Sequence, residues 1–468
     1  MPRPFFGCPG FTPHRLPPEA LACKIQKSLR CALERTAELT LPLTVNHALC
    51  ELTPPAQAFE LLQGGREFFP ALIRALDAAR TWVQLETYVF DLHGAGSEVA
   101  QALMRAARRG VTVQVLVDGV GSEPLAAPWQ QQLVQAGVQW QVYLPVRGTW
   151  GKLRLLLVPG RWRRLHRKLC VIDQQLLFCG GINVLDDLYD PNHGQLAAPR
   201  FDFTVQVTGA VARQAADAMA SLWWRVQAGD SVRHRQLAQA WDAVREAGQL
   251  VRGGPDWRGP AGGPARGRSH GRAGALPVSR AWLVLRDNLR HRKDIERAYR
   301  RAVGRAREEV LIANAYFLPG GRLKRALVQA ARRGVKVTLL LQGRYEYFMQ
   351  FHAVRSVYQA LLEAGVDIHE YETSFLHAKV AVVDGHWATV GSSNLDPLSL
   401  LLAREANVVV EDRDFAATLR ARLVAAIVSH GRQVEPAAHG SRPWRQRFLD
   451  QLAYRLMRLA LLVTGHRY

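Results

Sequence analysis

The stretch RLHRKLCVIDQQLLFCGGIN, residues Arg164–Asn183, shares its skeleton with FLHAKVAVVDGHWATVGSSN, residues Phe375–Asn394. In both, a His and a Lys lie two positions apart, an Asp follows, and a Gly-Gly or Gly-Ser pair precedes an Asn. A single His-x-Lys pattern is weak evidence, because structural histidines are common. Two copies with identical spacing are hard to obtain by chance, so the repeat indicates that this chain builds one polar set twice for a chemical purpose.

The repeat extends upstream of the two motifs. Residues Val83–Gly119 and Val310–Gly343 both read as a buried strand, a loop, an amphipathic helix and a second strand that begins after Gly110 or Gly334. Both helices end in AARRGV, with basic residues in the last turn and a Gly at the expected stop. Alternating strands and helices predict an α/β fold in each half. Two similar halves predict a pseudo-twofold arrangement that brings both motifs to one interface.

These features divide the chain into five parts. In chain order we expect an N-terminal extension of unknown role (1–55), a first half (56–232), a helix with a Gly/Pro/Arg-rich linker (233–276), a second half (277–430) and a basic amphipathic tail (431–468). The linker has almost nothing to bury, which predicts a disordered tether. Contact between its arginines and lipid headgroups is the less favoured alternative.

Length and charge limit the class of protein. The 468 residues suffice for two or three domains with cores, and about half are apolar, which excludes a solvated polyelectrolyte. The formal net charge of +21 predicts an anionic partner, either nucleic acid or a membrane surface. No apolar run approaches the roughly 18 to 20 residues that span a bilayer. The first residues lack the apolar core of a secretory signal, which predicts a cytoplasmic location.

The cysteines give no sign of a metal site. The six of them form no Cys-x-x-Cys pair and no zinc-like spacing. Cys170 and Cys179 fall in apolar, strand-like runs, so we expect packed thiols. No cluster of carboxylates suggests a cation site either, and we predict that the protein needs no metal and no cofactor.

The motif strands place a His and a Lys on one face. Side chains two apart in a strand point the same way, so His166 and Lys168 share a face, as do His377 and Lys379. A phosphate target explains this pairing, because imidazole supplies a nucleophile or a proton and an ammonium group neutralises a phosphate oxygen. The glycines that follow would let the backbone approach a ligand closely. The predicted phosphate-binding side chains are Asn183, Ser392 and Asn394.

Asp173 and Asp384 complete the repeated motif. Each lies seven residues after its histidine, an odd offset that points it to the opposite face of the strand. This position favours a structural role over a catalytic one.

Two histidines that face one phosphodiester can divide its chemistry between them. One neutral imidazole can attack phosphorus and form a covalent phosphohistidine. The other can protonate the leaving alkoxide and then act as base for the incoming alcohol or water. An unperturbed pKa of about 6.5 suits imidazole to both roles near neutral pH. Lys168 and Lys379 would offset the charge of the equatorial oxygens in the transition state.

The double motif resembles the phospholipase D superfamily, in which two His-Lys-Asp motifs meet at one active site. The resemblance implies two phospholipase D-like halves and favours His166 as the nucleophile and His377 as the acid and base. The family also orients each histidine with a downstream carboxylate; Asp202 in RFDFTVQVTG and Glu405 in AREANVVV occupy the matching places. The implied catalytic set is His166, Lys168, Asp173, His377, Lys379 and Asp384.

Further segments narrow the resemblance. LETYVF, RRLHRKLCVID, FCGGIN, FLHAKVAVVDG, GSSNLDPLSL and the tail ending LLVTG are similar to the bacterial cardiolipin synthases of the shorter B type. This similarity implies transfer of a phosphatidyl group between two phosphatidylglycerol molecules, with release of glycerol, by a peripheral protein at the cytoplasmic face of the cell membrane. The chain departs from the pattern at Ala403, where an Asn usually stands, and in its long linker. Both departures leave the acceptor open.

Two other functions stay open at this point. The same site could use water as acceptor, which would make the protein a phospholipase or a nuclease. A non-catalytic scaffold that binds membrane or nucleic acid is the third class. No helix-turn-helix, zinc finger or RNA-stacking signature supports nucleic acid, and the two intact motifs count against a scaffold. The sequence does not indicate an oligomeric state.

The tail from Pro443 onward predicts an amphipathic helix. Such a helix could lie in a membrane interface or dock on the core of the protein itself. Its apolar arc comprises Trp444, Phe448, Leu449, Leu452, Leu456, Leu459 and Leu462, opposite Gln446, Arg447, Asp450, Gln451 and Arg458. A second aromatic group could line an acyl-chain entrance or pack as a core helix; it comprises Tyr345, Tyr347, Phe348, Phe351 and Tyr358.

Overall fold

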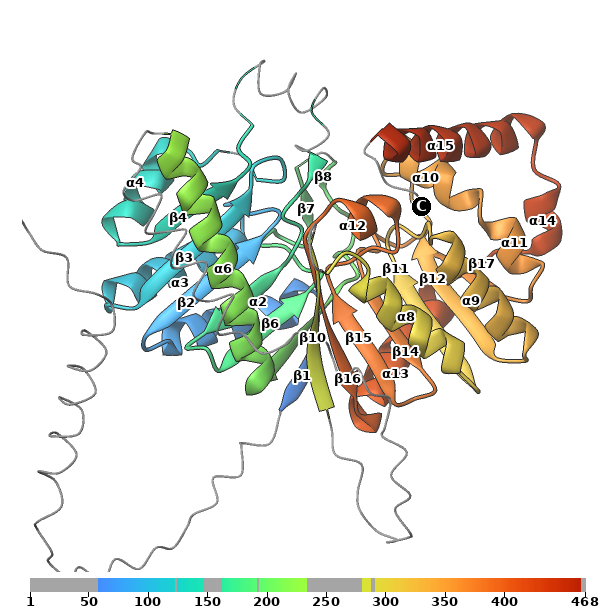
Figure 1. Ribbon diagram of the computed structural model, residues 1–468, viewed down its shortest axis with the longest axis horizontal. Helices are drawn as coiled ribbons and strands as arrows, with labels where there is room; N and C mark the ends of the chain where they lie inside the picture. The colour runs from blue at the N-terminus through green and yellow to red at the C-terminus, as the bar shows by residue number, and fades with distance from the viewer. Residues whose placement is uncertain are drawn as a thin grey trace, which may run out of the picture. The chain divides into compact units, whose positions relative to one another are not determined.

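The computed structural model describes most of the compact unit Pro54–Tyr468. The described residues are 58–122, 124–146, 148, 158, 162–191, 193–233, 280–287 and 291–463. The predicted N-terminal extension and the Gly/Pro/Arg-rich linker lie outside them. Two α/β halves follow each other along the chain (Figure 1), and the predicted fold class is confirmed.

The first half builds a seven-stranded mixed sheet in the order β1-β9-β6-β5-β2-β3-β4. Strands β2, β3 and β4 run parallel, and the other pairs are antiparallel. These strands are β1 (Phe59–Gln63), β2 (Trp82–Thr87), β3 (Thr112–Asp118), β4 (Gln139–Tyr143), β5 (Leu169–Ile172), β6 (Leu176–Gly180) and β9 (Phe203–Thr208). The hairpin β7 (Tyr189–Asp190) and β8 (Gly194–Gln195) is separate, and the helices are α2 (Gly64–Ala78), α3 (Ala95–Arg108), α4 (Ala127–Gln135) and α6 (Ala210–Arg233).

The second half builds an eight-stranded sheet in the order β10-β16-β15-β14-β11-β12-β13-β17, in which β11, β12 and β13 are parallel. Its strands are β10 (Arg280–Arg286), β11 (Glu309–Asn314), β12 (Lys336–Gln342), β13 (Asp367–Tyr371), β14 (Lys379–Val383), β15 (Trp387–Gly391), β16 (Glu405–Glu411) and β17 (Gly431–Gln433). Its helices are α8 (Asp294–Arg305), α9 (Gly321–Arg332), α10 (Phe348–Arg355), α11 (Tyr358–Leu362), α12 (Pro397–Leu401), α13 (Arg413–His430), α14 (Pro436–Gly440) and α15 (Trp444–Val463).

The repeated segments adopt equivalent structures. In each half a parallel strand pair is joined by the predicted amphipathic helix, α3 or α9. The glycines after these helices, Gly110 and Gly334, have φ values of 90° and 88°, a backbone conformation that favours glycine and ends the helix. The following strands then begin at Thr112 and Lys336, which confirms the prediction.

The faces of each sheet pack into different cores. In β5, Leu169 and Val171 belong to a core that both halves share, whereas Cys170 and Ile172 belong to an outer core with α2 and α3. The shared core also contains residues of α6 and α13 and of strands β14, β15 and β16. Cys170 and Cys179 are buried free thiols, as predicted. A continuous apolar contact therefore joins the two halves at the predicted interface.

The C-terminal segment docks on the second half instead of forming a separate part. Strand β17 pairs with the sheet edge at β13, and helix α15 packs along α10 (Figure 1). The docked face of α15 contains Asp450, Ala453 and Met457, all buried. Asp450 lies 2.7 Å from Nδ1 of His352 and 3.0 Å from the Arg442 guanidinium. None of the described helices is long and apolar enough to cross a bilayer.

Candidate active site

Backbone contacts between the halves fix the positions of both motif histidines. The backbone N–H of His166 donates to the carbonyl of Arg404 (3.0 Å), and that of His377 donates to the carbonyl of Phe201 (2.9 Å). Both contacts form isolated parallel bridges outside the two sheets. Arg404 and Phe201 directly precede the two predicted orienting carboxylates in the sequence. The same bridges therefore bring each carboxylate to the histidine of the opposite half.

The carboxylates pair with the histidines across the interface. Nδ1 of His377 lies 2.6 Å from Oδ2 of Asp202. Nδ1 of His166 lies 2.9 Å and 3.1 Å from the two carboxylate oxygens of Glu405. Both carboxylates are buried. Because each Nδ1 is engaged, Nε2 is the ring nitrogen left to react with a ligand.

The motif lysines lie beneath the histidines. Lys168 and Lys379 are buried, and each ammonium group donates to the backbone carbonyl of the histidine two residues earlier. The ammonium group of Lys168 also lies 5.4 Å from the ring centre of Tyr88. The lysines thus place positive charge directly behind the two imidazoles.

The motif aspartates lie away from the histidines. Asp173 accepts backbone hydrogen bonds from residues 80, 81 and 82, and Asp384 accepts them from residues 307, 308 and 309. Both aspartates have positive φ at the turns that follow β5 and β14. Their catalytic assignment from the family motif is therefore not what the geometry supports. They hold the start of a neighbouring strand, the structural role that their offset favoured.

Ser392 and Gly181 contact the two orienting carboxylates, those of Glu405 and Asp202, respectively. Ser392 is fully buried, and its hydroxyl donates to Glu405 at 2.5 Å, so the predicted contact with phosphate was wrong for this side chain. A Cβ atom on Gly181 would lie 2.3 Å from a carboxylate oxygen of Asp202. The expectation that this glycine makes room for a ligand was also wrong, because it makes room for Asp202.

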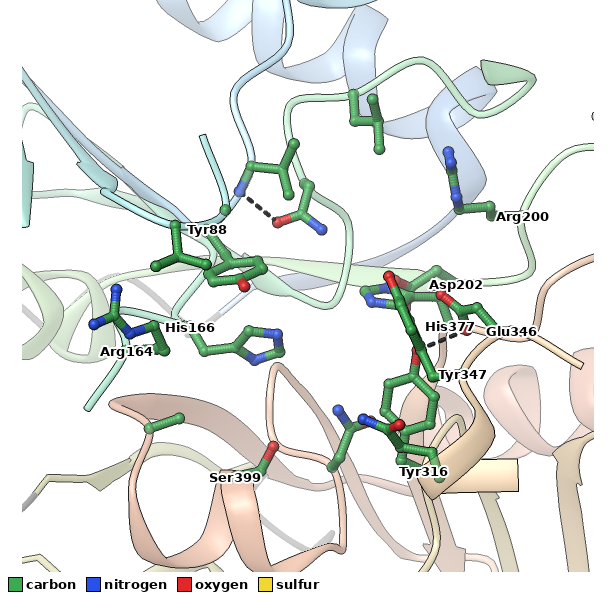
Figure 2. A pocket seen from close by; sticks show the side chains of 18 of the residues that line it. Tyr88, Arg164, His166, Arg200, Asp202, Tyr316, Glu346, Tyr347, His377 and Ser399 are labelled. Carbon is green, nitrogen blue, oxygen red and sulfur yellow. Dashed lines mark hydrogen bonds and ion pairs between the residues drawn. The ribbon is translucent and has the colours of Figure 1, made fainter. Parts of the chain in front are cut away.

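The two histidines and the predicted asparagines line one cavity of about 690 Å³. Figure 2 shows His166 and His377 facing the same space from opposite sides. Asn183 and Asn394 line it. Oδ1 of Asn183 accepts the N–H of Val89 (3.1 Å), which leaves its NH₂ group as the end that can donate to a ligand. Sequence reasoning missed other lining residues, among them Tyr88, Arg164, Arg200, Tyr316 and Glu346.

Three of the missed residues share a position in the fold. Tyr88 and Tyr316 follow the strands β2 and β11, and Glu346 follows β12. The cavity therefore opens at the carboxyl ends of parallel strands, where ligands bind in open α/β sheets. The rule that ligands bind at the carboxyl ends of parallel strands could have pointed to Tyr88, Tyr316 and Glu346 once the parallel strands were identified.

Burial controls the charges of the site. Desolvation lowers the pKa of His166 below its usual value, against the opposing effect of Glu405, and lowers that of His377 further, with help from Lys379. Desolvation also lowers the pKa of Lys168 to about 7 and that of Lys379 to about 8. It raises the pKa of Asp202 to about 7. Without a ligand, the imidazoles are therefore neutral near pH 7, and a bound anion would favour protonation of His377 and both lysines.

Among the described residues, no three His, Cys, Asp or Glu side chains are grouped so that they could hold a metal ion. Positive charge at the cavity comes from side chains instead. Arg164 and Arg200 reach it from the first half, and they pair with Asp118 (3.3 Å) and Asp190 (2.8 Å), respectively. The arrangement can bind an anionic diester between two imidazoles of opposite halves.

Comparison with known proteins gives consistent matches to one family. A family model described as "Cardiolipin synthase, PLD-like domain" matches residues 72–196 and 299–425. The chain is 37% identical to cardiolipin synthase B of Salmonella typhi and 35% identical to that of Escherichia coli K12, over 85% of this chain and 87% of each relative. Among solved structures, phosphatidylserine synthase of Haemophilus influenzae Rd KW20 shares the fold, with a TM-score of 0.59 at 13% identity, over 87% of this chain and 94% of that one.

Proposed function

The chain belongs to the family of cardiolipin synthases with phospholipase D-like domains, and from this we propose that it transfers a phosphatidyl group between two phosphatidylglycerol molecules. One observation carries the proposal: two imidazoles, each held at Nδ1 by a buried carboxylate of the other half, open on one cavity. The transfer needs a nucleophile and a proton donor on opposite sides of one phosphorus atom, and this arrangement supplies both.

The first step forms the covalent intermediate. Nε2 of His166 attacks phosphorus, and the bond between phosphorus and the glycerol oxygen breaks. Protonated His377 gives its proton to that oxygen, so glycerol leaves as a neutral alcohol and phosphatidyl-His166 remains. Glu405 supports this step because its negative charge stabilises the positive charge that develops on the His166 ring.

The second step releases the product. Neutral His377 takes a proton from a headgroup hydroxyl of a second phosphatidylglycerol, whose oxygen attacks phosphorus. The phosphorus–nitrogen bond breaks, cardiolipin forms, and His166 returns to its neutral state. Asp202 supports both steps because it fixes the His377 ring and stabilises its protonated form.

Charged and neutral donors stabilise the phosphorus centre. We assign Lys168 and Lys379 to offset the negative charge of the phosphoryl oxygens from behind the histidines. We assign Asn183 and Asn394, which line the cavity, as neutral donors to the same oxygens. Ser392 positions Glu405 and does not contact the lipid.

The proposal is tested by product analysis with labelled phosphatidylglycerol in vesicles. The wild-type protein should give cardiolipin and free glycerol, and His166→Ala should give neither. Enzyme denatured with detergent at neutral pH, since a phosphohistidine is acid-labile, should carry phosphate label that peptide mapping places at His166. Phosphatidic acid as the sole product would make water the acceptor and the protein a phospholipase. Label at His377 would reverse the roles of the two histidines.

We further propose that the enzyme works as a peripheral protein at the cytoplasmic face of the cell membrane. A row of apolar side chains on α15 is exposed, from Trp444 (68%) and Phe448 (58%) through Leu452, Leu456 and Leu459. Arg445, Arg447, Arg455 and Arg458 are exposed on the same helix. An apolar row flanked by cations suits the interface of an anionic bilayer, and the cytoplasmic leaflet carries such a charge.

Exposed aromatic side chains also occur in the loop before α10 and at the first residue of that helix. Tyr345, Tyr347 and Phe348 are exposed, and Tyr347 also lines the cavity. Tyr358, by contrast, is buried in the core of the second half. The predicted aromatic group therefore divides into a surface part near the cavity and a core part. We propose that the surface part meets the lipid whose headgroup enters the cavity.

The proposed function also assigns the parts of the chain. Residues 56–232 and 277–430 are the two catalytic halves, and residues 431–468 are the membrane-associating tail. Because α15 docks on the second half through the face that contains Asp450, Ala453 and Met457, the tail is held there with its apolar row outward. Docking and membrane contact, which were alternatives for this helix, use different faces of it.

A further inference from the structure

Glu346 is an acidic side chain in a cavity that otherwise suits an anion. It lines the cavity together with both histidines, and Figure 2 shows it on the His377 side. The transfer steps described above give it no task. An ionised carboxylate beside a phosphodiester repels it, so the charge of Glu346 disfavours a role in phosphate binding.

The position of Glu346 is built by the surrounding structure. The hydroxyl of Tyr316 donates to Oε2 of Glu346 at 2.6 Å. The two residues follow the neighbouring strands β12 and β11, so the pair is anchored at the carboxyl ends of that parallel pair. Burial raises the pKa of Glu346, while the bond from Tyr316 and the charge of Lys379 oppose that effect.

The chemistry on this side of the cavity involves alcohols. His377 exchanges protons with the oxygen of the leaving glycerol and with the hydroxyl of the incoming headgroup, so both alcohols must reach its imidazole. A glycerol headgroup carries further hydroxyls beside the reacting oxygen. A carboxylate accepts hydrogen bonds from hydroxyl groups and gives none when ionised, and bonds to a charged acceptor are stronger than neutral ones.

We infer that Glu346, held by Tyr316, binds the free hydroxyls of the glycerol headgroup and makes the enzyme select polyols over other alcohols and water. This inference rests on the proposed phosphatidyl transfer and adds the recognition of the alcohol. The leaving glycerol and the accepting headgroup use the same contact in turn, because both present their reacting oxygen to His377. Glu346 is thus a specificity-determining residue of the transfer reaction.

An acceptor competition tests the inference. The full chain is incubated with phosphatidylglycerol vesicles, labelled glycerol and 1-propanol, and the two products, labelled phosphatidylglycerol and phosphatidylpropanol, are measured together. Their ratio reports the preference between a polyol and a monohydric alcohol. Glu346→Gln should lower the preference for glycerol about 10- to 100-fold, the range expected for losing bonds to a charged acceptor, while phosphatidylpropanol still forms. Tyr316→Phe should lower it in the same direction by a smaller factor.

Glu363→Gln is the matched control, because Glu363 is an exposed glutamate that does not line the cavity. It should leave the preference unchanged. An unchanged preference in Glu346→Gln, or an equal loss of both products, would overturn the inference. Failure of wild type to form either product would overturn the proposed transfer itself, whereas formation of both products that depends on His166 supports it whatever Glu346 does.

Discussion

Oδ2 of Asp202 lies 2.6 Å from Nδ1 of His377, which stands 175 positions later in the chain and in the opposite half. The reciprocal pair, His166 and Glu405, spans 239 positions. Each half therefore supplies one imidazole to the cavity and the carboxylate that orients the imidazole of the other half. A variant in one half should for this reason impair the chemistry assigned to the histidine of the other.

Asp202→Asn should lower the rate of cardiolipin formation by about 10³- to 10⁴-fold, the loss expected when a buried carboxylate no longer fixes the tautomer of a catalytic imidazole. The reason is that an amide can favour the wrong proton position on His377. The rate is measured with phosphatidylglycerol vesicles. A lipid with a p-nitrophenol headgroup, which leaves without a proton, should restore formation of phosphatidyl-His166 and cause it to accumulate.

Asp414→Asn serves as the control, because Asp414 is an exposed aspartate on α13, and it should retain wild-type activity. A rate for Asp202→Asn within about threefold of wild type would contradict the assigned role of the pair.

Asp173→Ala should lower stability and spare the chemistry. The variant removes the acceptor for three backbone N–H groups at the start of β2 and places alanine at a φ of 50°. We expect the free energy of unfolding to fall by about 2–3 kcal/mol. Thermal unfolding measures this loss, and the turnover number at a temperature where the protein is folded should stay within about twofold of wild type.

The free energy of unfolding of Asp173→Asn should lie between those of wild type and Asp173→Ala, because asparagine tolerates positive φ and keeps one carbonyl oxygen. A large loss of turnover in folded Asp173→Ala would instead support the catalytic role that the family motif implies.

The value of kcat/KM should fall in two steps as the pH rises, through about 7 where Lys168 loses its charge and through about 8 where Lys379 loses its charge. Burial lowers the pKa of Lys379 to about 8, so this lysine is charged below that pH and loses its charge above it. The negative groups that favour its charged form are Asp202, Glu405, Glu346 and Asp396. Lys379→Arg should move the second step to higher pH, because guanidinium stays charged. The same second step at the same pH in this variant would assign it to another group.

Leu452→Gln/Leu456→Gln should weaken binding to phosphatidylglycerol vesicles about tenfold or more, since two side chains lose their apolar contact with lipid. Both side chains belong to the exposed row of α15 and lie outside its docked face. Vesicle sedimentation measures the binding. Val428→Gln is the control, because Val428 is 81% exposed on α13 and outside the row. Equal binding by the double variant and wild type would exclude α15 as the membrane contact.

The repeat alone predicts the architecture. Hydrophobic periodicity and the stop signals at Gly110 and Gly334 place the helices and the following strands correctly. The doubled motif also predicts that the halves meet, and the offset of Asp173 and Asp384 predicts that they point away from the histidines. The inferences about helices, strands and side-chain direction depend on local geometry, in which the periods of 2 and 3.6 residues decide which way a side chain points. The inference that the halves meet depends on the doubling of the motif.

The pairing of the carboxylates could not be predicted in the same way. A carboxylate downstream of a histidine can orient that histidine or its equivalent, and the sequence spacing is identical in both cases. The role of Ser392 depends on the position of Glu405, so the sequence spacing could not predict it either. Glu346 comes from an irregular loop that carries no periodic signal. On α15, the helical wheel finds an apolar arc, but the ion pairs of the buried Asp450 with His352 and Arg442 decide which face docks.

Reciprocal contacts between two equivalent sites, each giving a carboxylate and receiving one, are the pattern of an isologous dimer interface. In a true homodimer the two sites must stay identical, because one gene encodes both. Covalent linkage in one chain removes that constraint. The two sites already differ, with Asp202 opposite Glu405 and Gly181 opposite Ser392 at equivalent places. Fusion therefore allows the two imidazoles to be tuned separately, one toward attack and one toward proton transfer, a division of labour that a symmetric pair of subunits cannot encode.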